Sequence, residues 1–436
     1  MNAQSTEISI SSVLSPYFIV FLAAWFVTIV TTPLMRMLAV RFGVVDLPDK
    51  DRKNHLEPVA YLGGVAIFLG WMAGIVGCWW VTPHLPERLE IQHVQFPVTI
   101  IIGAVIITVV GVIDDVYGIV PRVKLGGQLF AAAMIAQTHL GEAFVRTTLR
   151  VLQIHDPHLF MGYHLSYVLG AAVIALMVLG ACNAVNLLDG LDGLVTGVLA
   201  ISCVGFLIIS VHVAINISGT GGGAMRAQYL TDPVRIVMCL AMLGALLGFL
   251  PHNFNPANIF MGDAGSLLLG YLCATTILLF AHASKHGPML VTAAMIVFAL
   301  PITDTALAIF RRIIARQPIF RGDDRHLHHQ FVRSFEQLGC GSSLSIKLAV
   351  ASMYVLALIF AALGCALVYV RWRFVIGVFV VIFGFVIVMG YKSARKQLMM
   401  IRAEQGVARD ETPSAAPAPP PDDVVGPAQD PQATGH

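Results

Sequence analysis

Apolar residues form long runs along most of the chain, and only short polar segments separate these runs. About 20 predominantly apolar residues can cross the hydrocarbon core of a bilayer as one helix. The pattern predicts eleven transmembrane helices, at 17–36, 61–81, 98–113, 124–141, 165–185, 194–215, 234–251, 266–284, 289–310, 346–370 and 374–391. The fourth fits least well, because it is short and contains two glutamines and a histidine. We therefore expect an all-α, polytopic membrane bundle.

The composition of the chain agrees with this class. Of its 436 residues, 57% are hydrophobic and 12% are charged, and the mean hydropathy is +0.78. Soluble domains carry about 25% charged residues, so the composition excludes a soluble globular protein. The seven cysteines show no paired metal-type spacing, and most of them lie in apolar runs. Neither a disulfide framework nor a thiolate metal site is indicated.

Lysine and arginine are distributed unevenly between the two sides of the predicted bundle. Of the 27 basic residues, 19 lie in segments that follow odd-numbered spans or at the span ends that border them, and 8 lie elsewhere. Such residues accumulate on the cytoplasmic side of a membrane. With eleven spans, we therefore expect the N-terminus outside and the C-terminus in the cytoplasm.

Two regions of different composition divide the chain. Residues 1–403 are expected to form one multi-span domain that carries the functional residues. From about Glu404 the chain is rich in Pro and Ala and has no apolar periodicity. Residues 404–436 are therefore expected to form a disordered cytoplasmic tail.

The segment 183–194 follows directly on a predicted span and contains two carboxylates and two amides. Polar groups at the end of a membrane-length segment are costly, so a functional role is the default interpretation. If the helix continues through Asp189 and Asp192, these side chains share a face that Asn183 and Asn186 approach. The neighbouring glycines would let a phosphate group come close to the backbone. The alternative is a polar, glycine-rich loop between two helices.

Two further acidic clusters follow odd-numbered spans. Asp114 and Asp115 end the third span, where the helix C-terminus disfavours negative charge, so they require a compensating cation. Lys124 follows a short distance along the chain. Asp263 lies between small residues just before an apolar helix. This position suits a carboxylate that binds a metal ion close to phosphate oxygens. The alternative for Asp263 is a helix cap.

Basic and imidazole groups form two more clusters on the same predicted side. Lys53 and His55 could contact a phosphate, although a solvated basic loop explains them equally simply. The segment 325–329 holds an arginine and three histidines. These could bind zinc, but phosphate recognition fits the neighbouring arginines better. Asp304 lies two turns before Arg311 and is expected to be structural.

Together these clusters describe a site for a divalent cation and a diphosphate. Mg²⁺ usually takes only one or two protein carboxylates and completes its shell with water and phosphates. Cations that neutralise the transferring group are the main requirement of phosphoryl transfer. Because the site lies at a membrane face, one substrate is expected to be a lipid phosphate and the other a soluble nucleotide.

Four ordered motifs closely resemble those of the polyprenyl-phosphate N-acetylhexosamine-1-phosphate transferases of glycosyltransferase family 4. They are Asn-Ala-Val-Asn-Leu-Leu-Asp-Gly-Leu-Asp-Gly at 183–193, the pair at 114–115, Asn-Ile-Phe-Met-Gly-Asp-Ala-Gly-Ser at 258–266 and Asp-Arg-His-Leu-His-His at 324–329. The last motif makes the chain more similar to the WecA/TagO branch than to the MraY branch. The resemblance extends from about Leu47 to Phe331.

The resemblance implies transfer of a sugar 1-phosphate from a UDP-sugar, typically UDP-N-acetylglucosamine, to undecaprenyl phosphate, with release of UMP. It implies Mg²⁺ as cofactor, with Mn²⁺ as an alternative, and the first membrane step of a cell-surface polysaccharide pathway. The expected location is the bacterial cytoplasmic membrane, with the site facing the cytoplasm. Expected partners are the donor, the lipid acceptor and membrane lipids. A homodimer is an open alternative to a monomer, and no nucleic-acid partner is expected.

The resemblance also implies roles for individual residues. Asp263 resembles the Mg²⁺ ligand, and Asp114 and Asp115 resemble the catalytic pair, one of which is proposed as the base that deprotonates the lipid phosphate. Asp189 and Asp192 complete the expected catalytic residues. The expected substrate contacts are Lys53, His55, Lys124, Asn186, Asn253, Arg325, His326, His328 and His329.

A secondary transporter is the competing interpretation, since intramembrane carboxylates also couple ions to transport. Transporter sites tend to lie near the bilayer midplane, often between inverted repeats. Here the carboxylates lie at span ends on one side, and no repeat is visible. The transferase is therefore favoured. The sugar and the pathway stay open, because N-acetylgalactosamine, fucosamine-type sugars and a muramyl-pentapeptide donor are also compatible with these residues.

Overall fold

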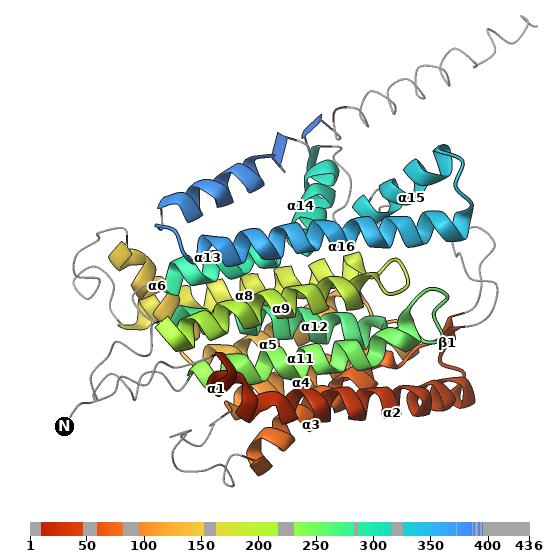
Figure 1. Ribbon diagram of the computed structural model, residues 1–436, viewed down its shortest axis with the longest axis horizontal. Coiled ribbons are helices and arrows are strands. Elements are labelled where there is room, and N and C mark those ends of the chain that lie inside the picture. The colour runs from red at the N-terminus through yellow and green to blue at the C-terminus, as the bar shows by residue number, and fades with distance from the viewer. Residues whose placement is uncertain are drawn as a thin grey trace, which may run out of the picture.

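In the computed structural model the chain is a bundle of roughly parallel and antiparallel helices (Figure 1). The structure describes residues 10–46, 59–81, 96–151, 163–216, 231–282, 287–314, 326–371 and 373–385, with 387–388, 391–392 and 395. The expected helical membrane bundle is confirmed. The tail at 404–436 lies outside the described residues.

Eight of the described helices are long and apolar enough to cross a membrane. Two of the eleven predicted spans correspond to helices that do not reach this length within the described residues: Pro121–Ala136 and the shorter apolar helix Arg373–Phe385. Eight of the predicted spans agree with long helices, apart from their ends. The long helices are α2 (Phe18–Phe42), α3 (Gly63–Val81), α4 (Val98–Tyr117), α8 (Tyr163–Leu188), α9 (Leu194–Asn216), α11 (Thr231–Asn253), α12 (Gly262–Leu279) and α16 (Ser342–Leu367).

The predicted span at 289–310 is not one straight helix. It consists of α13 (Gly287–Val297) and α14 (Ala299–Ile314), which are bent by 74° relative to each other. If the pair counts as one span, the described residues contain nine candidate spans. Pro301 lies in the first turn of α14 and has no N–H to donate to the carbonyl of Val297, the last residue of α13, so the two helices cannot continue as one regular helix. Hydropathy alone does not register this signal.

The remaining elements are short and lie around the long helices. Two-residue strands pair antiparallel, Val45 opposite Ala60 and Asp46 opposite Val59. A strongly amphipathic helix, α6, begins at the end of the fourth predicted span. The short elements are α1 (Ile10–Leu14), η1 (Ser15–Tyr17), β1 (Val45–Asp46), β2 (Val59–Ala60), α5 (Pro121–Ala136), α6 (Leu140–Val151), η6 (Phe280–His282) and α15 (Leu327–Gln337).

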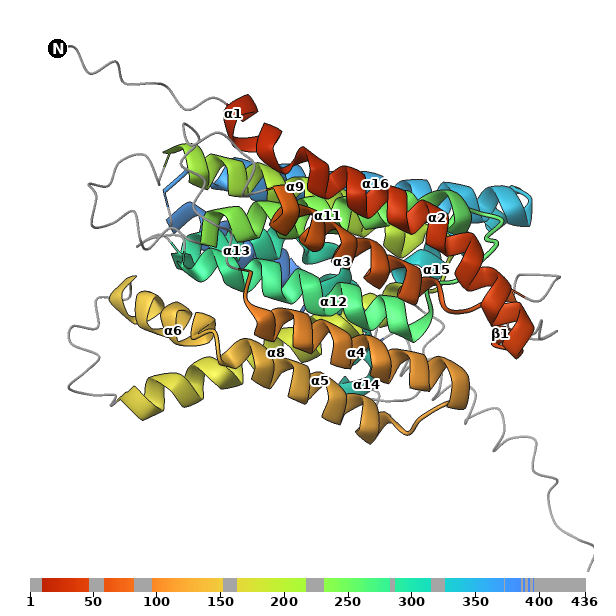
Figure 2. The same cartoon turned by 90° about the horizontal axis from the view of Figure 1, so that it is seen from below.

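Helix α12 is the centre of the bundle, with α3 and α11 on one side and α4 and α8 on the other (Figure 2). Every residue of α12 is buried except Asp263. A helix that is apolar on all sides belongs in the interior of a bundle. The single partly exposed residue of the central helix is therefore the carboxylate that the sequence singles out.

Glycines let the neighbouring helices approach the first turn of α12 closely. A Cβ atom on Gly64 of α3 would lie 2.1 Å from the backbone nitrogen of Gly265. A Cβ atom on Gly111 of α4 would lie 2.4 Å from Cα of Ala264. Helix interfaces in membranes favour small residues because these allow backbone contact. The packing fixes the position of Asp263 relative to α3 and α4.

Candidate active site

The connections that carry the acidic motifs meet at one end of the bundle. Figure 1 shows the α8–α9 and α11–α12 connections at the end where β1 and α15 lie, opposite α6. The α4–α5 turn joins them, because Lys124 of α5 contacts Asp263 of α12. The expectation that these clusters share one face of the bundle is thus confirmed for the described residues.

Asp115 caps the N-terminus of α12 from the end of α4. Its Oδ1 accepts a hydrogen bond from the N–H of Asp263 at 2.7 Å, and its Oδ2 accepts one from the N–H of Ala264 at 3.1 Å. The first N–H groups of a helix lack partners within the helix, and a carboxylate there also complements the helix dipole. The alternative in which Asp263 caps α12 is wrong, because Asp115 does so. Asp115 therefore fixes the backbone that carries Asp263.

Asp114 points to a different partner from its neighbour. Its Oδ2 pairs with the ammonium of Lys124, and its Oδ1 accepts a hydrogen bond from the N–H of Ile119 at 2.8 Å. Adjacent residues of a helix point in different directions, and the two aspartates accordingly have different surroundings. Lys124 supplies the compensating cation that the helix end requires.

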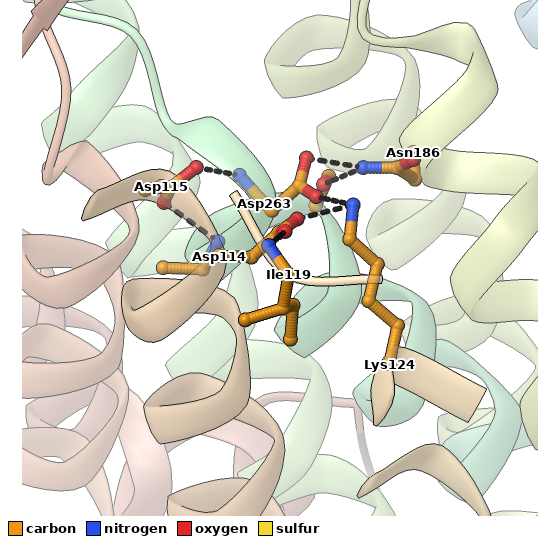
Figure 3. Close-up of polar contacts among 8 residues, drawn as sticks. Asp114, Asp115, Ile119, Lys124, Asn186 and Asp263 are labelled. Carbon is orange, nitrogen blue, oxygen red and sulfur yellow. Dashed lines mark hydrogen bonds and ion pairs between the residues drawn. The ribbon is translucent and has the colours of Figure 1, made fainter. Parts of the chain in front are cut away.

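Lys124 also pairs with Asp263, so one ammonium joins the carboxylates of α4 and α12 (Figure 3). The second oxygen of Asp263 accepts a hydrogen bond from Nδ2 of Asn186 at 2.7 Å. The same amide nitrogen lies 3.0 Å from Oγ of Ser266. Residues from α4, α5, α8 and α12 thus form one polar cluster.

The α8–α9 connection presents the remaining aspartates. Helix α8 ends at Leu188, so Asp189 and Asp192 lie in a loop and do not share a helical face. Gly193 has a φ of +74°, which favours glycine and breaks the helix. Burial raises the pKa of Asp189 to about 8, and repulsion from Asp263, Asp115 and Asp192 adds to this shift. The four carboxylates therefore interact electrostatically within one site.

Asp192 and Asn253 join the α8–α9 loop to the α11–α12 connection. Oδ2 of Asp192 accepts hydrogen bonds from Nδ2 of Asn255 at 2.9 Å and from the N–H of Ala257 at 3.0 Å. Oδ1 of Asn253 accepts bonds from the N–H of Gly193 and the hydroxyl of Thr196. Asn253 is buried and also donates to the carbonyl of Ile259. These contacts give Asn253 a clear role in holding the two loops together.

Three residues of this cluster did not emerge from the sequence as site residues. Asn255 and Ser266 lie inside the segment 252–266, so that polar cluster contained a signal for them. Tyr354 lies within the long apolar helix α16, and its hydroxyl donates to the carbonyl of Gly193 at 2.6 Å. No local pattern distinguishes such a tyrosine from one that packs in the core.

Asp304 holds the histidine motif at the start of α15. Its Oδ2 lies 2.9 Å from Nδ1 of His326, and its Oδ1 accepts a hydrogen bond from the N–H of Leu327 at 2.8 Å. The rings of His328 and His329 have centroids 4.2 Å apart. Asp304 was expected to be structural, and these contacts show that it anchors the motif.

His328 is buried against the α8–α9 loop. A Cβ atom on Gly190 would lie 2.5 Å from Nε2 of His328. Neither ring nitrogen has a hydrogen-bond partner within the described part of the chain. Burial, assisted by the neighbouring His329, lowers the pKa of His328 to about 3. The imidazole is therefore neutral at pH 7, so it offers dipoles rather than positive charge to a ligand.

The low pKa of His328 predicts a pH-dependent stability. An unfolded histidine titrates near 6.5, so between pH 6.5 and about 3 the unfolded chain binds a proton that the folded chain excludes. The stability contribution is complete above pH 6.5 and decreases as the pH falls. When the pH is lowered from 7.5 to 5, we expect the stability of His328→Gln to decrease less than that of the wild type. The measurement is the thermal unfolding temperature in detergent. Equal losses of stability in His328→Gln and the wild type over this pH range would contradict the explanation.

Lys53, His55 and Arg325 lie outside the described residues. The segment that follows the first two is described, and it reaches the site. The N–H of Gly63 donates to the carbonyl of Phe260 at 3.0 Å, and the N–H of Gly64 donates to the carbonyl of Met261 at 2.9 Å. The roles expected for the three basic residues stay predictions.

The donor set at Asp114 and Asp263 fits a hard divalent cation. Two carboxylate oxygens from different helices face one position, and the ammonium of Lys124 occupies it. Among the described residues no group of three or more His, Cys, Asp or Glu is arranged to hold a metal, so the zinc alternative for the histidines gains no support. Mg²⁺ does not need such a group, since it keeps several waters and substrate phosphates.

Comparison with known proteins identifies relatives that cover most of the chain. The model of glycosyl transferase family 4 matches residues 97–281. A probable undecaprenyl-phosphate N-acetylglucosaminyl 1-phosphate transferase of Bacillus subtilis is 32% identical over 79% of this chain and 82% of its own length. A decaprenyl-phosphate N-acetylglucosaminephosphotransferase of Mycobacterium tuberculosis is 34% identical over 72% of this chain and 75% of its own length.

A more distant relative belongs to the other branch. A phospho-N-acetylmuramoyl-pentapeptide-transferase of Geobacillus kaustophilus is 28% identical over 76% of this chain and 89% of its own length. The matched family segment contains the acidic pair of α4, the α8–α9 loop and Asp263. The fold, the clustered carboxylates and these similarities together show that the chain belongs to glycosyl transferase family 4, as a multi-pass prenyl-phosphate sugar-1-phosphate transferase.

Proposed function

We propose that this enzyme transfers N-acetylglucosamine 1-phosphate from UDP-N-acetylglucosamine to undecaprenyl phosphate. The products are a lipid-linked diphosphate sugar and UMP. The observation that carries this proposal is the meeting of Asp114, Lys124 and Asp263 at one end of a membrane bundle. The names of the two N-acetylglucosaminyl relatives support this sugar.

The reaction is written as an in-line displacement at phosphorus. A phosphate oxygen of the lipid acceptor attacks the sugar-bearing phosphorus of the donor, the new P–O bond forms, and the P–O bond to UMP breaks. The electron pair of that bond leaves on UMP. Both substrates are anionic, so the site mainly has to neutralise charge and align the two phosphates.

The geometry supports different roles for the two adjacent aspartates. Both oxygens of Asp115 accept backbone N–H groups, so we assign it a positioning role. Asp114 directs an oxygen toward Lys124 and therefore belongs to the reacting site. A phosphate monoester has a second pKa of about 6, so the acceptor is largely deprotonated at pH 7. Strong general-base catalysis is therefore not required.

Mg²⁺ is the cofactor that fits this donor set, with Mn²⁺ as the alternative. Asp263 would hold it, with Asp114 as the second carboxylate. When bound, such an ion polarises phosphoryl oxygens and stabilises their negative charge. Asn186 keeps the carboxylate of Asp263 oriented through its hydrogen bond. His328 and the loop around Gly190 would line the same region.

The proposed location is the cytoplasmic membrane of a bacterium, with the site open to the cytoplasm. The unequal distribution of the 27 basic residues supports this orientation. A UDP-sugar is made in the cytoplasm, so a site at that face has direct access to the donor. The enzyme would perform the first membrane step of a surface polysaccharide pathway.

The test uses the purified protein in detergent, where no gradient exists. With undecaprenyl phosphate, Mg²⁺ and a panel of radiolabelled UDP-sugars, we expect label from UDP-N-acetylglucosamine to become lipid-extractable and UMP, not UDP, to appear. A matching label from UDP-N-acetylgalactosamine would change the sugar but keep the reaction. Absence of any lipid product, combined with solute uptake into sealed vesicles, would favour the transporter alternative.

A further inference from the structure

The ammonium of Lys124 lies between two carboxylates that come from different helices. It pairs with Oδ2 of Asp114 on α4 and with Oδ2 of Asp263 on α12 (Figure 3). Lys124 itself lies in the first turn of α5, shortly after Pro121. A single positive charge therefore holds together the ends of α4, α5 and α12.

The other two oxygens of these carboxylates are held by neutral donors. Oδ1 of Asp114 accepts from the N–H of Ile119, and Oδ1 of Asp263 accepts from the amide of Asn186. These bonds orient each carboxylate so that its Oδ2 faces Lys124. The two oxygens that a divalent cation would share are thus the two that bind the ammonium.

We propose that Lys124 holds the cation position between Asp114 and Asp263, and that a divalent cation binds there only by displacing its ammonium. The inference rests on the proposed function in one respect only, which is that the anion bound by the displaced ammonium is the diphosphate of the donor. Lys124 is long and flexible, and 28% of its side chain is exposed, so it can turn toward the opening of the site. There it would bind the diphosphate of the donor.

The charges explain why displacement would be coupled to donor binding. Two carboxylates and one ammonium leave one negative charge, whereas two carboxylates and Mg²⁺ leave none. With Mg²⁺ bound, the displaced ammonium remains as an extra positive charge beside the site. An anionic diphosphate offsets that charge, so cation and donor should each strengthen the binding of the other. The expected property is weak cation binding in the absence of nucleotide.

The first test measures Mn²⁺ binding to the full-length protein in detergent without nucleotide, by electron paramagnetic resonance of the free ion. Lys124→Met should bind Mn²⁺ roughly tenfold or more tightly than the wild type, a change typical of coupled sites. Lys347→Met, which removes an exposed lysine from α16, should bind like the wild type. In an Asp263→Asn background, Lys124→Met should bring no increase. Unchanged or weaker Mn²⁺ binding by folded Lys124→Met would overturn the proposal.

The second test needs no variant and so does not depend on how Lys124→Met folds. Wild-type protein is treated briefly with an amine-acetylating reagent, and modification of Lys124 is quantified by mass spectrometry. Adding Mg²⁺, at constant ionic strength, should increase acetylation of Lys124 and leave Lys347 unchanged. Equal or slower acetylation of Lys124 with Mg²⁺ contradicts displacement. Both tests read cation binding without any sugar donor, so failure of the proposed transferase reaction would be seen separately.

Discussion

Replacing Asp263 by Asn is expected to reduce Mg²⁺-dependent product formation by roughly 10²- to 10³-fold, the order of effect seen when a preorganised group that stabilises transition-state charge is removed. Asp263 is the one partly exposed residue of the central helix, and its carboxylate pairs with Lys124 at the proposed cation position. An amide keeps the shape but lacks the charge that a hard divalent cation requires. The measurement is initial rate of lipid-linked product at saturating donor, over a range of Mg²⁺ concentrations.

The matched control for this substitution is Glu336→Gln, which neutralises an exposed carboxylate on α15. It should keep the wild-type rate and Mg²⁺ dependence. Folding of both variants is checked by thermal unfolding, because Asp263 also pairs with Lys124. Near-normal Mg²⁺-dependent activity of folded Asp263→Asn would rule out Asp263 as the main metal ligand.

Gly111→Ala is expected to destabilise the protein by about 1–3 kcal/mol, as overpacking in a close-packed core usually does. The added Cβ would lie 2.4 Å from Cα of Ala264, which is a backbone atom and cannot rotate away. Helices α4 and α12 must separate, and the carboxylates of Asp114 and Asp263 move apart with them. A misplacement of about 1 Å can cost about 10²-fold in rate, so activity should fall to a similar degree.

The contrast for Gly111→Ala is the same substitution on α5. Gly126 is also in a helix, but a Cβ there would meet nothing within 4 Å. Alanine is favoured over glycine in a helix interior by up to about 1 kcal/mol, so Gly126→Ala should be neutral or slightly stabilising. The two variants are compared by unfolding in detergent and by turnover. Similar behaviour of both would mean that backbone contact between α4 and α12 does not control the site.

Local sequence was sufficient for the features that depend on one segment at a time. A long apolar run becomes a helix in a membrane because its backbone groups must bond within the segment. The polar clusters lie at helix ends because charged groups are costly inside the bilayer. The requirement for a cation beside Asp114 follows from the helix dipole alone, and Lys124 provides it.

Features that depend on contacts between distant segments could not be predicted from the local sequence. Nothing near Asp115 in the chain indicates that it caps a helix that begins almost 150 residues later. The spacing of Asp189 and Asp192 suited a helix as well as a loop, and packing against Asn253 and Asn255 selected the loop. Tyr354 resembles any other aromatic residue of an apolar span until α16 is placed beside Gly193.

The sequence by itself determined that this is a helical membrane protein with acidic, amide and histidine motifs suited to phosphate chemistry, because composition and periodicity act locally. Only the tertiary structure decided which of two adjacent aspartates pairs with Lys124 and which caps α12, since both are chemically identical and differ only in direction. It also decided that Lys124 bridges Asp114 and Asp263. The physical reason is that long-range packing, here the backbone contact of α4 with α12 through Gly111, sets the directions from which charged groups meet.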